Sequence, residues 1–323
     1  MAHIYVYSPS GAVRDRAAFR RGVRCLRTLG HDVEIDPAAL AHWQRFAGDD
    51  ATRLAAIARA VASGADVALT TRGGYGLTRL LPTLSYKTIT RAIDRGTRFV
   101  GFSDFTALQL ALLASTGGVT WAGPALCEGF GARSGDDLPE GPGDASVPSG
   151  PDEIMLACFD DLVSGRTEGT GWRLPAADVT ALASRRHLAH QATLWGGNLS
   201  MLASLLGTPW WPEVNEGVLF LEDVGEHPYR IERLLAQLLY AGVLARQKAI
   251  LLGSFNDYRL TPHDRGYSLG KAVDWLRGKL KTPVLTKLPF GHVSTKVLLP
   301  VGAKVDLLIE GREALVLWGH LLH

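Results

Sequence analysis

Residues 99–118 read FVGFSDFTALQLALLASTGG, and this stretch decides the fold class. A short apolar strand, Phe99 to Gly101, leads through a serine into an apolar helix that we expect from about Phe105 to Ala114. The glycine pair at 117 and 118 stops this helix as a C-terminal cap does. A strand that passes directly into a helix is typical of an α/β fold.

The chain before this stretch repeats the alternation of strand and helix. Strands are predicted at residues 4–7, 33–35 and 67–70, and amphipathic helices near residues 15–29 and 50–62. Such alternation indicates parallel strands that are joined by helical crossovers. We therefore predict an α/β protein whose N-terminal domain, residues 1–128, is an open, doubly wound, mostly parallel sheet. Sheets of this kind bind ligands at the carboxyl ends of their strands.

A change of composition divides the chain after this domain. Residues 129–152 hold six Gly and four Pro among 24 residues, a density that predicts a linker or an exposed loop. Beyond it, strand-like runs at 218–221, 249–252 and 314–318 accompany one strong helix, Pro228 to Ala241. We expect residues 153–323 to form a smaller, mixed α+β domain, with a curved or barrel-like sheet as one alternative.

The composition favours a globular protein that acts on small molecules or peptides. The sequence is 46% apolar and 20% charged, and its 34 Lys and Arg nearly balance its 32 Asp and Glu. A net charge of +2 gives no field strong enough to indicate binding to nucleic acid or to an anionic membrane. No apolar run approaches the ~20 residues that span a bilayer, and residues 3–7 read as a first strand, not as a signal peptide. We therefore expect a cytoplasmic protein.

Cysteine and histidine spacing gives no sign of a metal site. Cys25, Cys127 and Cys158 are odd in number and form no C-x-x-C pair, so we expect buried, reduced thiols. The close histidine pair His187 and His190 lacks the acidic partner of a zinc-protease helix. We therefore expect neither a disulfide framework nor a bound metal.

A glycine-rich turn, RGGYG at residues 72–76, follows the third predicted strand. It is not a dinucleotide-binding turn, because Arg79 stands where that motif needs Gly or Ala, and no Gly-Lys-Ser/Thr of a phosphate loop follows. Its backbone N–H groups are suited to approach a substrate closely, for instance as donors to an oxyanion. On its own, such a motif is more often a tight turn and nothing more.

Ser103 lies between the end of a strand and the start of a helix. In a nucleophile elbow this arrangement exposes the serine hydroxyl and aims the helix N–H groups at developing negative charge. Serine is also a preferred N-cap, which is the simpler explanation of this residue alone. Phe105 occupies the second glycine position of the G-x-S-x-G elbow, so an ordinary α/β-hydrolase is disfavoured.

Glu222 and Asp223 follow directly on the predicted strand 218–221. Because strand ends hold side chains rigidly, one of these carboxylates can orient a histidine and stabilise its charged form. Side chains alternate along a strand, so only one of the two is expected to face a cleft, and we select Glu222. The alternative is a capping or salt-bridging pair that faces Arg230 and Arg233.

Two further segments place polar groups on turns. His292 ends the turn PFGH at 289–292 and is a candidate general base, although a lone histidine is more often a surface or core residue. Residues 192–200 hold a glycine pair between Trp195 and Asn198. An indole wall and an amide suit a peptide cleft, and a turn before a helix at 199–206 explains the segment equally well.

Taken together, five motifs in this order resemble the LD-carboxypeptidase family of serine peptidases. They are RGGYG at 72–76, GFSD at 101–104, GGNL at 196–199, LEDVGE at 221–226 and PFGH at 289–292. The family includes the muramoyl-tetrapeptide carboxypeptidases of peptidoglycan recycling and the microcin C self-immunity peptidases. The resemblance runs from about Tyr5 to Leu315, and the joint occurrence of the motifs overturns the simpler explanation of each.

The resemblance implies that Ser103 is the nucleophile, His292 the general base and Glu222 the residue that orients the histidine. It implies an oxyanion hole made by the backbone N–H groups of Asp104 and of one glycine of the Gly73-Gly74 pair, which we take to be Gly74. It also implies a Rossmann-like N-terminal domain, a smaller C-terminal domain that supplies the Glu and the His, an active site between them, and a homodimer. We expect no cofactor and no metal.

A carboxypeptidase must recognise the free terminal carboxylate of its substrate, for which Arg or a cluster of N–H groups is the natural receptor. Arg72 and Arg230 are the candidates, and Gly73, Asn198 and Trp195 are further candidate substrate contacts. The resemblance implies that a small peptide, murein tetrapeptide, loses its terminal D-Ala by hydrolysis of an L,D bond. The alternatives are a microcin-C-type self-immunity amidase or peptidase, an esterase with the same triad, and a ligand-binding protein with an unused serine.

The sequence departs from the family pattern in two places. One is the long Gly/Pro-rich segment after Glu128, and the other is an apparently lengthened connection, Thr83 to Thr90, between the glycine turn and Ser103. Both departures bear on the shape of the cleft and therefore on substrate preference.

Overall fold

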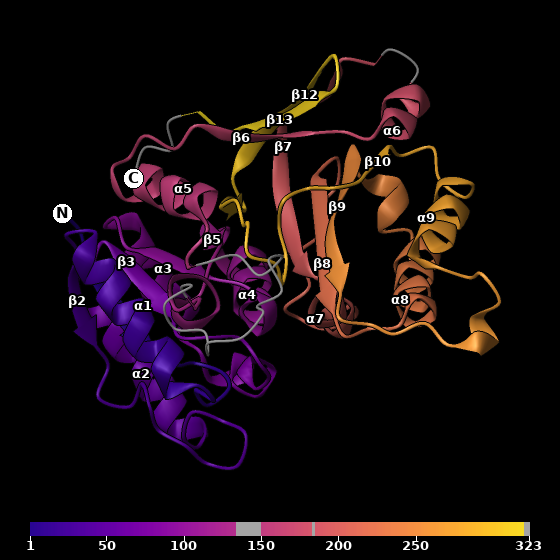
Figure 1. The fold of residues 1–323 in the computed structure, drawn as a ribbon. Coiled ribbons are helices and arrows are strands. Elements are labelled where there is room, and N and C mark those ends of the chain that lie inside the picture. Colours follow the sequence, from indigo (N-terminus) through magenta and orange to yellow (C-terminus); the bar gives the residue numbers. More distant parts are fainter. Residues whose placement is uncertain (134–149, 183–184, 320–323) are drawn as a thin grey trace, which may run out of the picture.

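The computed structural model describes residues 1–133, 150–182 and 185–319, which form two sheets lying side by side (Figure 1). The first sheet has the strand order β11-β5-β4-β3-β1-β2. Its strands are β1 (His3–Tyr7), β2 (Asp32–Ile35), β3 (Val67–Thr70), β4 (Arg98–Gly101), β5 (Thr120–Ala122) and β11 (Leu299–Val301). Five strands run parallel and only β11 is antiparallel to its neighbour β5, which confirms the predicted mostly parallel sheet.

Helices cover both faces of this sheet. They are α1 (Arg16–Thr28), α2 (Asp50–Ala62), α3 (Tyr86–Asp94), α4 (Thr106–Thr116) and α5 (Glu153–Val163). The alternation along β1 shows the two layers, because Ile4 and Val6 pack with α1 and α5, whereas Tyr5 and Tyr7 pack with α2, α3 and α4. The sheet is therefore doubly wound, as predicted.

Local sequence signals set the ends of the predicted helices. Asp15 caps α1, because its Oδ1 accepts from the backbone N–H groups of Ala17 and Ala18, and Asp49 caps α2 in the same way. Gly117 ends α4 in the left-handed conformation at φ +71°. The stretch that looked like a lengthened connection is largely the crossover helix α3, which the sequence analysis missed.

The second sheet has the strand order β10-β9-β8-β7-β12-β13-β6. Its strands are β6 (Gly169–Arg173), β7 (His187–Asn198), β8 (Val218–Val224), β9 (Ala249–Asn256), β10 (Val284–Leu285), β12 (Lys304–Glu310) and β13 (Glu313–Leu317). Its helices are α6 (Ala176–Ala181), α7 (Leu199–Leu205), α8 (Pro228–Tyr240) and α9 (Leu269–Arg277). Strands β7 to β10 are parallel and the pairs from β7 to β6 are antiparallel, so the sheet is mixed.

The glycine pair at 196 and 197 does not form the turn that was one of the two explanations of this segment. Both glycines belong to β7, which continues to Asn198 and pairs with β8 in parallel register. In this register Gly196 lies opposite Phe220, and Asn198 lies opposite Glu222. The two polar residues thus end neighbouring parallel strands, where side chains of a parallel sheet meet.

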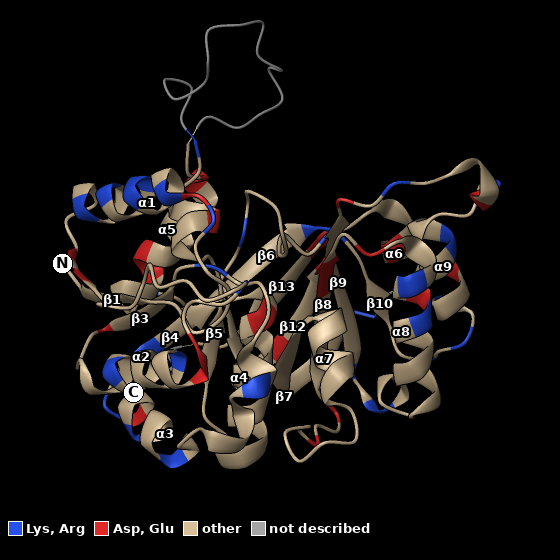
Figure 2. Cartoon of the chain, turned by 90° about the horizontal axis from the view of Figure 1, so that it is seen from below, with Lys and Arg blue, Asp and Glu red and all other residues tan. Residues whose placement is uncertain are grey.

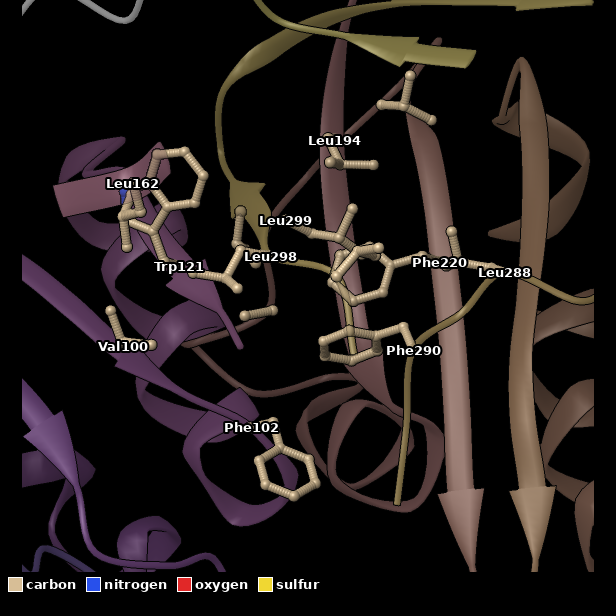
Figure 3. Packing of buried hydrophobic residues seen from close by; sticks show 14 of the residues in the cluster. Val100, Phe102, Trp121, Leu162, Leu194, Phe220, Leu288, Phe290, Leu298 and Leu299 are labelled. Carbon is tan, nitrogen blue, oxygen red and sulfur yellow. The ribbon is translucent and has the colours of Figure 1, made fainter. Parts of the chain in front are cut away.

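One continuous apolar core joins the two sheets. Figure 3 shows Val100 and Trp121 of the first sheet facing Leu298 and Leu299, which lie between them and the second sheet. Strand β11 therefore returns to the first sheet from residues that we assigned to the second domain. The domain boundaries stay a prediction, and the centre of the predicted linker, residues 134–149, lies outside the described residues.

Charges of both signs are distributed over the outer helices, with Arg gathered on α1 (Figure 2). Within residues 1–133, 150–182 and 185–319, no helix is long and apolar enough to cross a membrane. Cys25, Cys127 and Cys158 are free, as expected, but they are only partly buried.

Gly196 provides a test of the β7 assignment. Its φ is +131°, and a Cβ at this position would overlap the Phe220 carbonyl oxygen. Gly196→Ala is therefore expected to lower the free energy of unfolding by at least about 2 kcal/mol, from backbone strain plus displacement of β8. Gly207→Ala is the control, because Gly207 has φ +80° but open space around it, so only about 1 kcal/mol of strain is expected. Urea unfolding measures both, and equal losses would contradict the overlap argument.

Candidate active site

Ser103 lies where β4 ends and the chain turns towards α4. It follows Phe102, which is still extended, and opens a short 3-10 helix, Ser103–Phe105, that runs directly into α4. Its φ is +61°, in the left-handed region that residues with a side chain rarely adopt. The Ser103 hydroxyl forms no capping hydrogen bond, so the N-cap explanation of this serine is wrong. Strain of about 1–3 kcal/mol at one residue persists only where the surroundings impose it, and such residues cluster at active sites.

The glycine turn after β3 packs directly against this serine. A Cβ built on Gly73 would lie 2.6 Å from Ser103 Cβ, 2.7 Å from Ser103 Oγ and 3.5 Å from the Asp104 backbone nitrogen. Only glycine permits this approach. The turn is held from its other side, because Gly11 N donates to the Gly73 carbonyl oxygen at 3.2 Å.

The Asp104 side chain joins the elbow to the end of the glycine turn. Its Oδ2 accepts a hydrogen bond from Leu77 N at 3.0 Å, and the side chain is almost completely buried. Burial raises the pKa of this carboxyl above its ordinary value, although the hydrogen bond from Leu77 acts in the opposite direction. The carboxyl of Asp104 is therefore structural, while its backbone N–H lies next to Ser103.

His292 and Glu222 form a hydrogen-bonded pair. His292 Nδ1 lies 2.8 Å from Glu222 Oε2, and because an ionised carboxylate can only accept, Nδ1 carries the proton of this bond. Glu222 is 0% exposed, and its second oxygen accepts from Asn198 Nδ2 at 3.2 Å. The histidine is fixed at its backbone too, since Asn256 Nδ2 donates to the His292 carbonyl oxygen at 2.8 Å. The other ring nitrogen, Nε2, is left for proton exchange.

Phe102 brings the histidine to the serine elbow. Its ring centroid lies 4.8 Å from that of His292, and Phe102 directly precedes Ser103 in the chain. Among the described residues, no hydrogen bond joins Ser103 Oγ to the imidazole. Such bonds often tighten only when a substrate is bound.

Asp223 has a structural role that differs from that of Glu222. Its Oδ2 accepts from the backbone N and the hydroxyl of Ser200, and its Oδ1 accepts from Asn198 Nδ2, so it holds the start of α7. A bulge in the pairing of β8 with β9 lies between Leu221 and Asp223. The extra residue of this bulge lies in β9, where Leu252 to Phe255 is three steps against two in β8. Both carboxylates accept from Asn198, and only Glu222 also contacts His292. Of the alternative explanation, the capping role holds for Asp223, and in the described part of the chain neither carboxylate forms an ion pair with Arg230 or Arg233.

The remaining predicted substrate contacts do not lie together in the structure. Arg72 lies beside the glycine turn, and its Nε is 3.4 Å from Glu128 Oε1. Arg230 is half exposed on α8, where it pairs with Glu226 at 3.7 Å. Trp195 is 0% exposed, packs against Trp211 and donates from Nε1 to Gln247, so it belongs to the core and does not line a cleft.

Lys296 was missed by the sequence analysis. It is 2% exposed, its Nζ donates to the Val293 carbonyl oxygen, and the same atom lies 4.7 Å from the centre of the Phe102 ring. Burial lowers the pKa of this ammonium to about 8. A lysine four residues after His292 has no sequence feature that separates it from a surface lysine.

His292 also lines a cavity of about 950 Å³ between β9, α9 and residues 286–295. Asn256, Tyr258 and Lys287 form other parts of its wall. In the part of the chain that the structure describes, no group of three or more His, Cys, Asp or Glu side chains is placed to hold a metal ion.

Comparisons with known proteins fit this arrangement. Residues 4–123 match the LD-carboxypeptidase N-terminal domain and residues 191–307 match the LD-carboxypeptidase C-terminal domain. The chain therefore belongs to the LD-carboxypeptidase family, which is a family of peptidases.

Individual relatives cover from about three quarters to nearly all of the chain. A muramoyltetrapeptide carboxypeptidase from Oxalobacter formigenes has a similar solved structure, with a TM-score of 0.80, 34% identity and 97% of both chains covered. A putative carboxypeptidase of Streptomyces coelicolor is 33% identical over 95% of this chain and 90% of its own length. The microcin C7 self-immunity protein of Escherichia coli is 28% identical over 76% of this chain and 72% of its own length.

The contact between Gly73 and Ser103 gives a direct test of the elbow. Gly73→Ala adds a methyl group that displaces the serine, and a shift of about 1 Å is expected to slow labelling of Ser103 by a fluorophosphonate on the order of 100-fold. Gly270→Ala is the control, because the nearest atom to its added methyl lies 3.7 Å away. Labelling is followed by mass spectrometry. Unchanged labelling of a folded Gly73→Ala variant would show that this contact does not shape the nucleophile.

Proposed function

We propose that this chain is a serine-type L,D-carboxypeptidase that releases terminal D-Ala from murein tetrapeptide. The observation that carries the proposal is the Glu222–His292 pair, which packs through Phe102 against the strained Ser103 elbow. The names of relatives support the substrate class, since one is a muramoyltetrapeptide carboxypeptidase. A cytoplasmic location and a homodimer, which the resemblance implies, complete the proposal.

In the proposed mechanism, His292 Nε2 takes the proton of the Ser103 hydroxyl while Ser103 Oγ bonds to the scissile carbonyl carbon. The carbon–nitrogen bond then breaks, and His292 gives the proton to the leaving amine of D-Ala. Water attacks the acyl-enzyme with the help of the same histidine, which frees the tripeptide and restores the serine. Glu222 accepts from Nδ1 throughout and stabilises the charged imidazole during both steps.

The oxyanion of each tetrahedral intermediate is proposed to lie between two backbone N–H groups. Asp104 N lies at the start of the helical turn that leads into α4, so the partial positive charge of the helix end adds to its effect. Gly74 is the proposed second donor, and its N–H forms no hydrogen bond with any described residue. Its φ of +114° is accessible to glycine without strain.

A self-immunity peptidase of the microcin C type is the second candidate, favoured by the relative from Escherichia coli. An esterase would use the same three side chains on an ester. Hydrolysis of p-nitrophenyl acetate without cleavage of any L,D-peptide would favour the esterase.

The two adjacent carboxylates give a test of the triad. Glu222→Gln removes the negative charge and turns one of the two acceptor oxygens into an NH2 donor, so it cannot accept from both His292 Nδ1 and Asn198 Nδ2, and we expect kcat to fall about 100-fold or more. Asp223→Asn disturbs the start of α7, so it is expected to cost about 1–3 kcal/mol of stability and much less turnover. Steady-state kinetics and urea unfolding separate the two effects. A larger loss of kcat in Asp223→Asn would refute the assignment of Glu222.

The substrate class is tested with matched peptides. Attack from Ser103 fixes the trajectory at the carbonyl, so inverting the leaving residue moves its carboxylate away from the receptor, which can cost on the order of 100-fold in rate. We expect the L,D-tetrapeptide to lose D-Ala much faster than its L,L counterpart loses L-Ala, amidation of the terminus to weaken turnover, and chelators to leave activity unchanged. Mass spectrometry follows the products. Rapid cleavage of the amidated peptide would argue against a carboxypeptidase, and inhibition by chelators would argue against the serine mechanism.

A further inference from the structure

Glu128 places a carboxylate directly beside the glycine turn. Its Oε1 lies 3.4 Å from Arg72 Nε, and its Oε2 accepts from the Gly73 backbone N–H at 3.5 Å. The two oxygens thus contact one guanidinium and one backbone donor, which is the combination that binds a carboxylate ligand. Because Gly73 packs against Ser103, this carboxylate lies next to the nucleophile.

The Arg72 side chain is built into this position. The guanidinium packs over two glycines, since a Cβ at Gly11 would lie 2.5 Å from Arg72 Nη1 and a Cβ at Gly74 would lie 2.8 Å from the same atom. Two positions without side chains therefore make room for the cation. The Arg72 side chain is only 12% exposed, so the guanidinium has little water around it and needs an anionic partner.

The chemistry of a C-terminal peptide bond sets where a receptor for the terminal carboxylate must lie. Three bonds separate the scissile carbonyl carbon from the carboxylate carbon, so the two atoms are at most about 4 Å apart. The receptor must therefore be an immediate neighbour of the nucleophile. Arg72 and Gly73 meet this condition through the contact of Gly73 with Ser103, whereas Arg230 is held on α8 by Glu226.

We propose that Arg72 and the Gly73 N–H form the receptor for the terminal carboxylate of the substrate, and that Glu128 is an internal carboxylate that occupies this receptor and yields it to the substrate. The inference rests on the proposed function for the identity of the substrate. Exchange of one carboxylate for another keeps Arg72 paired at each stage. Glu128 thereby competes with the substrate and adjusts the affinity for free acids.

The geometry of Glu128 suits a carboxylate that a substrate can displace. Both of its contacts are at the long end of the range for such interactions, and its side chain is 33% exposed. Its backbone departs from helical angles within the short helix Leu126–Phe130, at φ −109° and ψ 39°. A partly exposed ion pair of this kind is weak, so a substrate carboxylate can replace it.

The experiment compares Glu128→Gln with the parent enzyme on free and amidated tetrapeptides. Removing the internal carboxylate is expected to lower KM for the free acid about two- to fivefold, and to leave the amidated peptide without this gain. Arg72→Gln is expected to raise KM for the free acid and to reduce the difference between the two peptides. Glu216→Gln is the matched control, because Glu216 is a glutamate paired with Lys248 on an exposed surface.

A binding measurement separates this inference from the proposed function. In a Ser103→Ala background, calorimetry of the free-acid tetrapeptide should show affinity increased two- to fivefold by Glu128→Gln and decreased by Arg72→Gln, with no change for the amide. If these affinity changes are observed but the parent enzyme does not cleave the tetrapeptide, the proposed function is refuted and the receptor is supported. Unchanged or weaker free-acid binding in Glu128→Gln, or no binding at all, would overturn the receptor. If Glu128→Gln does not fold, Glu128→Asp withdraws the carboxylate by one methylene and is expected to change affinity in the same direction.

Discussion

The hydrogen bond from His292 Nδ1 to the buried Glu222 carboxylate is the interaction on which the arrangement of the site depends. A carboxylate without solvent contact is costly unless donors satisfy it, and here the donors are His292 and Asn198. One donor comes from the loop before β11 and the other from the end of β7, so a single buried charge holds together three segments. The parallel register of β7 and β8 makes this possible, because it places Asn198 opposite Glu222.

The sequence predicted the first sheet well where local signals and long-range packing agree. The predicted bounds of α2 match the structure, since Asp49 caps its start and its apolar positions follow the helical period. Helix α3 was missed because it begins with Tyr86 and contains Thr88, Ile89 and Thr90, which are aromatic or β-branched and have low helix propensity. Burial of Ile89 and Ile93 against the sheet outweighs that preference.

The end of β7 shows a related limit. A Gly-Gly pair most often indicates a turn, but β8 pairs with it in parallel register and overrides the local preference. The same packing places Trp195 in the core, although an indole beside glycines looked suited to a cleft. Residue types alone cannot distinguish these outcomes, because burial depends on a partner strand about twenty residues away in the sequence.

For the site, too, the sequence shows which residue types are present but not how the fold places them. Ser103, Glu222 and His292 were selected from motif and context, and these features are local in the sequence. The choice between Glu222 and Asp223 rests on alternation along the strand, and it does not predict that both carboxylates accept from Asn198. No local sequence motif marks Lys296 or Glu128, because the role of each depends on the side chains that the fold places beside it.

The charges around Ser103 explain why such hidden residues matter. Arg72 and Lys296 are cations with little solvent contact, and both lie near Glu128, whose negative charge helps to keep Lys296 protonated. An anion receptor beside a nucleophile needs a cation that is already desolvated, yet an unpaired buried cation destabilises the fold. A weakly held internal carboxylate satisfies both requirements, because its replacement by a ligand carboxylate leaves the charge of the site unchanged. A neutral terminus cannot make this exchange, so in the proposed receptor the constraint that stabilises the ligand-free state also favours free acids.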